Sequence, residues 1–154
     1  MVVRDKSDDD AAWIADLLRS RWGQPVMVVH GEEVDARAIP ALVAGDRAGL
    51  ATYRLIGDET ELVTLDAVEP GRGVGTRLLE ALARRLIADG VRRLWVTTTS
   101  DNLRALAFYQ KRGFRLHRVR PGAVDEARRL KPRIPLIADN GIPIRDEIDL
   151  CRDF

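Results

Sequence analysis

The sequence predicts a mixed α/β fold in which antiparallel strands lead into a parallel strand–helix–strand unit. The antiparallel part is indicated by apolar runs that flank two consecutive turn signals, at residues 45–47 and 57–59. The parallel part is indicated by a change of hydrophobic period, from that of a strand to that of a helix, after Gly75. Because 154 residues fall in the size range of one domain, we expect residues 1–154 to form a single unit.

The chain begins with a candidate strand at residues 2–4, followed by an amphipathic helix. Ser7 and the three aspartates after it have the pattern of a capping box, and the acidic first turn suits the helix dipole. The helix should end near Gly23, because Pro25 cannot continue it. Residues 26–29 are β-branched and predict a strand. Four apolar residues share the inner face of the helix: Trp13, Ile14, Leu17 and Leu18.

The middle of the chain predicts an antiparallel meander of three strands, at residues 41–44, 49–56 and 61–68. A helix follows up to Gly90, and residues 94–99 predict the next strand. Strand, glycine loop, helix and strand form a right-handed βαβ unit, so its two strands should be parallel, with the loop at the carboxyl end of the first. The apolar face of the helix carries four leucines: Leu78, Leu79, Leu82 and Leu86.

The C-terminal part predicts a second helix at residues 101–112, capped by Gly113, and a strand at residues 114–119. One or two helical turns are expected at residues 123–131, followed by a proline-punctuated loop and a last strand at residues 142–150. That last segment alternates apolar and charged residues, as in a half-buried strand: Ile142, Ile144, Ile148 and Leu150 against Arg145, Glu147 and Asp149.

Composition excludes several classes of function. Lys and Arg number 25 against 24 Asp and Glu, so no global basic field recruits nucleic acid or an anionic membrane. Cys151 is the single cysteine, which rules out an intramolecular disulfide and a cysteine-cluster metal site and suits a reducing compartment. Neither His30 nor His117 belongs to a metal-binding pattern, so we expect no metal. With neither a signal peptide nor an apolar run of spanning length, we expect a cytoplasmic protein.

Three glycines, Gly71, Gly73 and Gly75, alternate in the loop between strand and helix. Such a loop presents unpaired N–H groups at the positive end of the helix dipole, which bind phosphate oxygens where no side chain intervenes. Arg72 and Arg77 add local positive charge. The alternative interpretation is that the glycines only shape a tight turn.

Two common phosphate motifs are absent from this loop. The dinucleotide fingerprint G-x-G-x-x-G fails in both registers, because Thr76 and Leu78 occupy the position of its last glycine. A P-loop needs a Gly-Lys pair, and the chain has none. A nucleotide-dependent oxidoreductase is therefore disfavoured.

Two segments resemble the cofactor motifs of the GCN5-related N-acetyltransferases: VEPGRGVGTRLLEAL at 68–82 and SDNLRALAFYQKRGF at 100–114. The family's first motif, roughly (Q/R)-x-x-G-x-(G/A), cradles the pyrophosphate of acetyl-coenzyme A. Here Pro70 stands at its Gln or Arg position, and Arg72 is the candidate replacement. Residues 141–147 resemble the closing strand of a bacterial branch of the family. The second motif, N-x-x-A-x-x-F-Y-x-K-x-G-F, is matched by Asn102, Ala105, Phe108, Tyr109, Lys111, Gly113 and Phe114.

The resemblance implies the fold of that family, with parallel strands that splay apart, and an acetyl-coenzyme A-dependent N-acetyltransferase. The acceptor would be a primary amine, on a small molecule or a peptide, that attacks directly in a ternary complex; family members often form homodimers. Tyr109 would be the general acid toward the coenzyme sulfur, and Asn102 would bond the pantetheine arm or a bridging water. Backbone groups would hold the pantetheine and thioester at Ala67, Val68 and Glu69, and the pyrophosphate at Arg72, Gly73, Val74, Gly75 and Thr76.

The general base has several candidates. Asp66 lies in an apolar strand beside the expected thioester, where a carboxylate can have a raised pKa and take a proton through water, or can be a salt-bridged structural acid. Glu69, Asp146 and Glu147 are alternatives, and direct attack with water as the proton sink is another. A different class of function, a non-catalytic acyl-coenzyme A sensor, would bind without turnover.

The tryptophans and one basic run each have a structural and a functional interpretation. Core packing, rather than a cage for a cation, is the expected role of most of the three tryptophans, Trp13, Trp22 and Trp95. The basic run at residues 128–133 is expected to be a solvated loop rather than a site for the coenzyme 3′-phosphate or an acidic substrate. Two segments, at residues 26–40 and 121–141, are expected to line the acceptor pocket. Neither carries a motif that identifies the acceptor.

Overall fold

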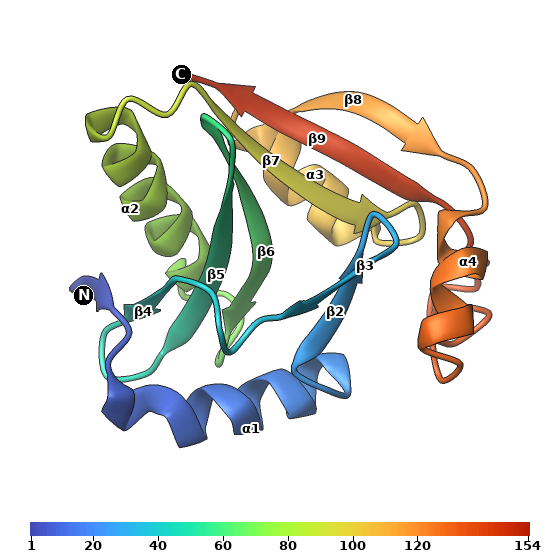
Figure 1. Cartoon of the computed structure of the whole chain (residues 1–154), viewed down its shortest axis with the longest axis horizontal. Helices are drawn as coiled ribbons and strands as arrows, with labels where there is room; N and C mark the ends of the chain where they lie inside the picture. The colour runs from blue at the N-terminus through green and yellow to red at the C-terminus, as the bar shows by residue number, and fades with distance from the viewer.

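Seven strands form one sheet and two more form a separate hairpin in the computed structural model, which describes residues 1–154 (Figure 1). In chain order the elements are β1 (Val3–Asp5), the short 3-10 helix η1 (Asp8–Asp10), α1 (Ala11–Trp22), β2 (Val26–Val29), β3 (Glu32–Asp35), β4 (Ala41–Ala44), β5 (Gly49–Ile56), β6 (Glu59–Ala67), α2 (Val74–Ala88), β7 (Arg93–Thr99), α3 (Leu103–Lys111), β8 (Arg115–Arg120), α4 (Ala123–Leu130) and β9 (Glu147–Asp153). The order within the sheet is β1-β4-β5-β6-β7-β9-β8, and the hairpin is β2-β3. The predicted mixed α/β class is confirmed.

The parallel pair of the sheet, β6 and β7, is short and then opens. The two strands are in register at Thr60–Leu94, Glu61–Trp95 and Leu62–Val96, and no pairing continues beyond Leu62. A register shift against β5 leaves Val63 unpaired, and such a bulge bends a strand. β7 stays with β9 up to Thr99, so β6 and β7 diverge in the V visible in Figure 1.

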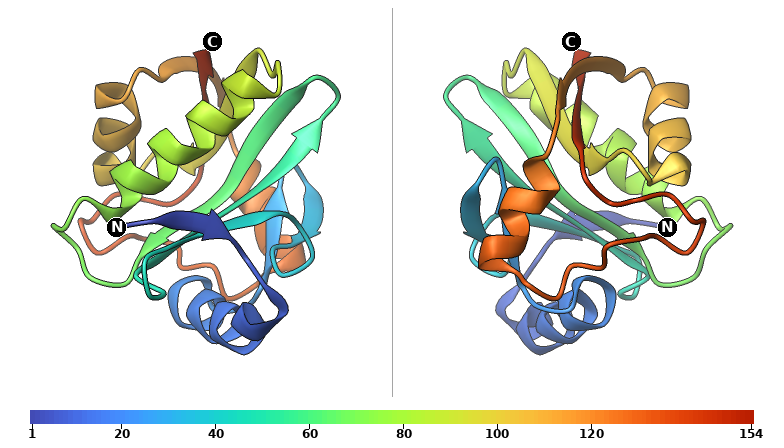
Figure 2. Two further views of the ribbon diagram at one scale, coloured as in Figure 1. Left: turned by 90° about the vertical axis from the view of Figure 1, so that its left-hand side faces the viewer. Right: turned by 90° about the vertical axis from the view of Figure 1, so that its right-hand side faces the viewer.

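Helices cover both faces of the sheet and divide the interior into two cores (Figure 2). α2 and α3 bury one face, where Leu78, Leu82 and Tyr109 pack against strand residues such as Leu62. α1 and the β2-β3 hairpin bury the other, where Leu18 and Met27 belong to one cluster with strand residues. The apolar faces predicted for the two long helices are the faces that are buried.

Local signals fix both ends of α1. The backbone N–H of Ser7 donates to Asp10 Oδ2 at 2.9 Å, which is the predicted return contact of the capping box. At the other end Gly23 adopts a left-handed conformation, and its N–H donates to the carbonyl of Arg19. No helix in the structure combines the length and apolar character needed to cross a bilayer.

The prediction for the last strand is partly wrong. β9 begins at Glu147 rather than at residue 142, and residues 142–146 form a loop with one isolated bridge, Ile137 to Pro143. Glu147 and Asp149, which the sequence places on the charged face of a half-buried strand, are both buried. β9 lies between β7 and β8, so neither of its edges is free. Polar partners, among them Arg120, compensate the charge of the two buried acids.

Those partners include the β2-β3 hairpin, whose second strand the sequence did not predict. His30, at the hairpin turn, places Nε2 at 3.0 Å from Asp149 Oδ1 and 3.1 Å from Thr97 Oγ1. Arg54 of β5 contacts Glu32 of the hairpin at 3.3 Å. Polar contacts therefore attach the hairpin across the open part of the sheet.

Candidate functional site

The glycine loop after β6 has the open geometry expected of an anion cradle. Gly71 and Gly73 have φ of +81° and +73°, a region that other residues rarely adopt, and no atom lies within 4 Å of a Cβ built on either. At Gly75 a Cβ would lie 3.5 Å from the ring of Phe108, which is ordinary contact. The first two glycines are therefore required by backbone conformation, and they leave the loop uncovered.

Consecutive backbone N–H groups in this loop have no partner in the protein. No hydrogen bond is donated by the amides of residues 72–76, whereas the amide of Arg77 donates to the carbonyl of Gly73. α2 is a 15-residue helix that begins at Val74, so these donors lie at the positive end of its dipole. The arrangement is suited to bind phosphate oxygens.

A cavity of about 610 Å³, which we call the loop cavity, lies between this loop and α3. Arg104, Lys111 and Arg112 of α3 line it. Arg112 donates to Thr76 Oγ1 at 2.9 Å and lies 3.7 Å over the ring of Phe108, which ties α3 to the start of α2. Positive side chains thus surround the free amides.

Arg72 and Glu69 form an exposed ion pair at the edge of the loop cavity, with 2.7 Å between Nε and Oε2. Both residues were expected to take part in cofactor binding. Their side chains are mostly in solvent, 73% and 66% exposed, so the pair is easily opened by water or by a ligand.

The backbone groups of β6 that face the opening are not quite those expected at Ala67, Val68 and Glu69. The amide of Val68 donates to Ala48 and its carbonyl accepts from Arg21, so neither group is free. Because backbone groups alternate along an antiparallel strand, Asp66 also turns its amide to β5, while Leu65 and Ala67 turn theirs toward the opening. Both of these residues line the loop cavity.

Tyr109 lies at the inner end of the loop cavity and is 8% exposed. Its ring packs edge-on against Phe108 and Phe114. Burial, with the nearby charge of Asp66, raises the pKa of Tyr109 well above its usual value. The phenol therefore keeps its proton at neutral pH.

Asp66 is buried on β6, the strand that opens away from β7, and it is absent from the lining of both the loop cavity and the second cavity described below. Trp22 Nε1 donates to Asp66 Oδ2 at 2.9 Å. Burial raises the pKa of Asp66, and the bond from Trp22 and the charge of Arg21 only partly oppose that shift. The sequence favoured core packing for most of the tryptophans; Trp22, the last residue of α1, is instead 43% exposed and orients a carboxylate.

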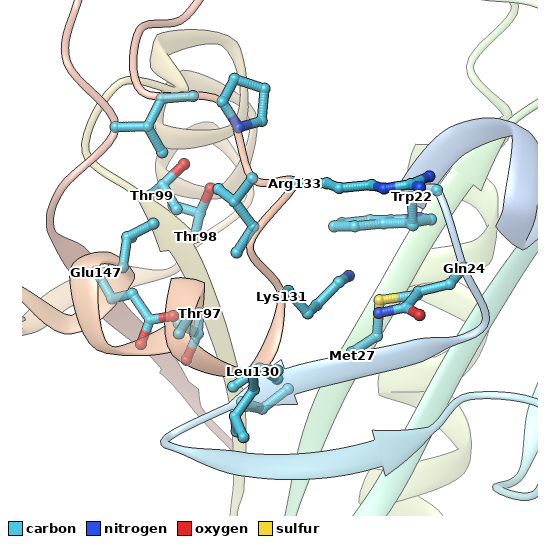
Figure 3. Close-up of a pocket in the computed structure, with 18 of the residues that line it drawn as sticks. Trp22, Gln24, Met27, Thr97, Thr98, Thr99, Leu130, Lys131, Arg133 and Glu147 are labelled. Carbon is cyan, nitrogen blue, oxygen red and sulfur yellow. The ribbon is translucent and has the colours of Figure 1, made fainter.

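A second cavity, of about 810 Å³, lies on the other side of the opening and is called here the hairpin cavity (Figure 3). Its walls are the end of α1, the β2 strand, the threonines of β7, and α4 with the segment after it. β6 contributes Leu62 and Val63 to this cavity and Leu65 and Ala67 to the loop cavity, so both cavities are lined by the part of β6 where its pairing with β7 ends.

The remaining candidate residues are distributed around these cavities. Asn102 lines the hairpin cavity, and its Oδ1 caps α3 by accepting from the amide of Ala105 at 3.1 Å. Glu147 lines the same cavity, and burial raises its pKa although it pairs with Arg120. Asp146 lines neither cavity, because its carboxylate accepts from the amide of Gly122 at 2.8 Å. No group of three or more His, Cys, Asp or Glu side chains is arranged to hold a metal ion.

Comparison with known proteins identifies relatives over nearly the whole chain. Residues 10–114 match the sequence model of the acetyltransferase (GNAT) family. The protein YxbD of Bacillus subtilis (strain 168), uncharacterized, is 40% identical over 148 residues, which cover 92% of this chain and 91% of that protein. The amino-acid acetyltransferase of Pseudomonas syringae pv. syringae is 30% identical over 132 residues, 80% of this chain but 28% of that protein.

The fold is shared with solved structures. A GNAT family acetyltransferase from Elizabethkingia anophelis, crystallised with acetyl-CoA bound, aligns with a TM-score of 0.69 at 18% identity. The alignment covers 99% of this chain and 97% of that one.

Proposed function

Since the chain belongs to the acetyltransferase (GNAT) family, we propose that it transfers an acetyl group from acetyl-coenzyme A to a primary amine by direct attack in a ternary complex. The observation that carries the proposal is the row of unpartnered amides at residues 72–76, which opens onto the loop cavity. A diphosphate fits this cradle, because the two left-handed glycines leave the space over the amides empty.

The thioester arm would lie along the free edge of β6. The amides and carbonyls of Leu65 and Ala67 face the opening and are the groups best placed to bond the pantetheine and the thioester oxygen. Leu65 thus takes the role that the sequence gave to Val68. Asn102 has committed Oδ1 to Ala105, which leaves its Nδ2 for the pantetheine arm or a water.

The chemistry needs a proton donor on the sulfur side and a proton acceptor on the amine side. As the amine nitrogen bonds to the carbonyl carbon, the carbon–sulfur bond breaks, and Tyr109 gives its phenolic proton to the departing thiolate. Its raised pKa keeps that proton available. Asp66, ionised and held by Trp22, takes the proton of the attacking amine through water.

Thiol release and coenzyme binding test this function together. The chain, mixed with acetyl-coenzyme A and a panel of amines, should release free thiol in an amine-dependent way, and acetyl-coenzyme A should raise the melting temperature. Saturable binding without thiol release for any amine would instead identify a non-catalytic acyl-coenzyme A sensor. No feature of the site favours that alternative. Absence of binding by calorimetry would refute both.

A further inference from the structure

The hairpin cavity has an unbalanced set of charges. Of its lining residues, three are cationic, Arg21, Lys131 and Arg133, and one is anionic, Glu147. The rest of the wall is apolar or neutral, with hydrophobic side chains from α1, β2 and α4. This local excess contrasts with the chain as a whole, whose net charge is +1.

The single anion is already neutralised by the protein. Glu147 Oε1 pairs with Arg120 at 2.7 Å, and the same guanidinium reaches Asp149 at 3.0 Å. Figure 3 places Glu147 beside Thr97, on the side of the cavity away from Trp22 and Gln24. Glu147 therefore does not balance the cations of the opposite wall.

Two of those cations, Lys131 and Arg133, have no counter-ion in the protein, and the third, Arg21, has only the nearby charge of Asp66. Neither Lys131 nor Arg133 forms an ion pair, and Arg21 donates only to the carbonyl of Val68. Lys131 is half-buried, and its side chain points into the space bounded by Trp22, Gln24 and Met27 (Figure 3). Burial lowers the pKa of Lys131, because nothing nearby compensates the charge that is taken out of water.

The wall that carries the cations is anchored. Arg128 of α4 donates to three backbone carbonyls of the following segment, those of Ile134, Pro135 and Ile144, at 3.2, 2.5 and 2.6 Å. Arg128 is only 13% exposed, so these charge-assisted bonds are shielded from solvent. Lys131 and Arg133 therefore belong to a preorganised surface.

We propose that the amine acceptor is a small molecule that also carries a carboxylate, which is bound by Lys131 with help from Arg133 and Arg21. The proposal rests on the function proposed above and names the acceptor class of that site. The carboxylate would supply the missing counter-charge at the basic wall, while the amine reaches the opening where β6 and β7 diverge. A polycationic amine would meet like charge at this wall.

Matched acceptor pairs test this class. The full chain with acetyl-coenzyme A is assayed for thiol release with each standard amino acid beside its α-carboxamide, which keeps the skeleton and removes the carboxylate charge, and with spermidine as a polycation. For the preferred amino acid we expect kcat/KM to exceed that of its carboxamide at least about tenfold, the effect of one charge-assisted hydrogen bond. Spermidine should be a poorer acceptor than the acid.

Two variants link this preference to the wall. Lys131→Met keeps the apolar stem and removes the charge, so it should raise the KM for the amino acid and bring the acid-to-carboxamide ratio toward unity. The KM for acetyl-coenzyme A should not change. Arg129→Met removes an exposed cation of α4 that lines neither cavity, and it should leave the ratio as it is in the wild type.

Each other result counts against the inference. Equal turnover of acids and carboxamides, a preference for spermidine, no turnover of any acid, or a ratio that Lys131→Met leaves unchanged would overturn it. In these cases thiol release with other amines would leave the proposed function standing. Failure of acetyl-coenzyme A to bind, measured without acceptor, would remove the proposed function and this inference with it.

Discussion

The loop cavity and the hairpin cavity lie on either side of the same opening in the sheet, but they are built from different material. The loop cavity relies on main-chain amides from one continuous segment, at residues 72–76. The hairpin cavity collects side chains from α1, β2, β7, α4 and the segment after α4. A surface made of backbone leaves a short sequence pattern, whereas a surface assembled from distant side chains leaves none.

Among the side chains that line the loop cavity, Tyr109 is the one whose loss should have the largest effect. Tyr109→Phe removes the proposed proton donor for the thiolate and keeps the packing against Phe108 and Phe114. We expect kcat to fall about 10²- to 10⁴-fold, the usual contribution of general acid catalysis, with nearly unchanged affinity for acetyl-coenzyme A. Steady-state kinetics and calorimetry measure the two quantities.

The matched control is the other tyrosine of the chain. Tyr53 is equally buried, at 8% exposed, but belongs to β5 and lines neither cavity. Tyr53→Phe should leave kcat close to that of the wild type. If Tyr109→Phe does the same, the phenol is a packing residue and not the general acid.

The backbone character of the loop cavity is tested by adding a side chain. Gly73→Ala places a methyl group in the empty space over the amides and forces alanine into a left-handed conformation, which costs roughly 1–2 kcal/mol. Loss of one charge-assisted hydrogen bond to the diphosphate is worth about 1.5–3 kcal/mol, or roughly 10- to 100-fold in affinity. Calorimetry with coenzyme A measures this loss.

Gly57→Ala separates backbone strain from ligand binding. Gly57 has φ of +62° in the β5–β6 turn, and its Cβ position is also empty. Both variants should lose similar stability in thermal melts, but only Gly73→Ala should bind the coenzyme more weakly. Equal loss of affinity in the two would mean that strain, and not access to the amides, controls binding.

The sequence predicts what local signals determine and fails where long-range pairing decides. The turns of the meander, the βαβ unit and the glycine loop each depend on neighbouring residues, and all are present. The free edge of β6 depends on register with β5, so the sequence could not show that the backbone groups of Val68 are already paired. Nor could it show the contact of Trp22, because only the fold brings the end of α1 to Asp66.

The burial of the acidic residues of β9 also depends on long-range contacts. An alternating strand predicts that its charged face is in solvent, and Glu147 and Asp149 would then be exposed. Both acids can be buried because Arg120 on β8 and His30 on the hairpin compensate their charge. Arg120 lies at least 27 residues away along the chain and His30 at least 117, so neither partner has a local signature. The basic wall of the hairpin cavity is similar, since Arg128 fixes it through backbone carbonyls that no motif marks.

Two buried carboxylates, Asp10 and Asp66, differ in how many partners compensate their charge. Asp10 accepts from Arg4 at 2.7 Å, from Arg47 at 3.0 Å and from the amide of Ser7, and these partners hold its pKa well below the usual range. Asp66 has only Trp22, and burial raises its pKa. Ionised Asp10 therefore stabilises the fold, whereas ionised Asp66 costs stability.

The pH dependence of stability distinguishes Asp10 from Asp66. Of the changes predicted here, these are expected to have the smallest effect. Stability from Asp10 is present above the ordinary carboxyl pKa and is lost as the pH falls, so Asp10→Asn should destabilise near neutral pH, by roughly 1.5–3 kcal/mol. The penalty from Asp66 is absent below the ordinary carboxyl pKa, grows as the pH rises from that value to the raised pKa, and is constant above it. Asp66→Asn should therefore melt higher than the wild type near neutral pH, by about 2–4 °C for each kcal/mol relieved, and the difference should vanish toward about pH 4. Its kcat should fall at the same time, because the amide cannot take the proton of the amine. A variant that melts lower at neutral pH and keeps its kcat would instead place Asp66 with Asp10, as an acid that supports the fold.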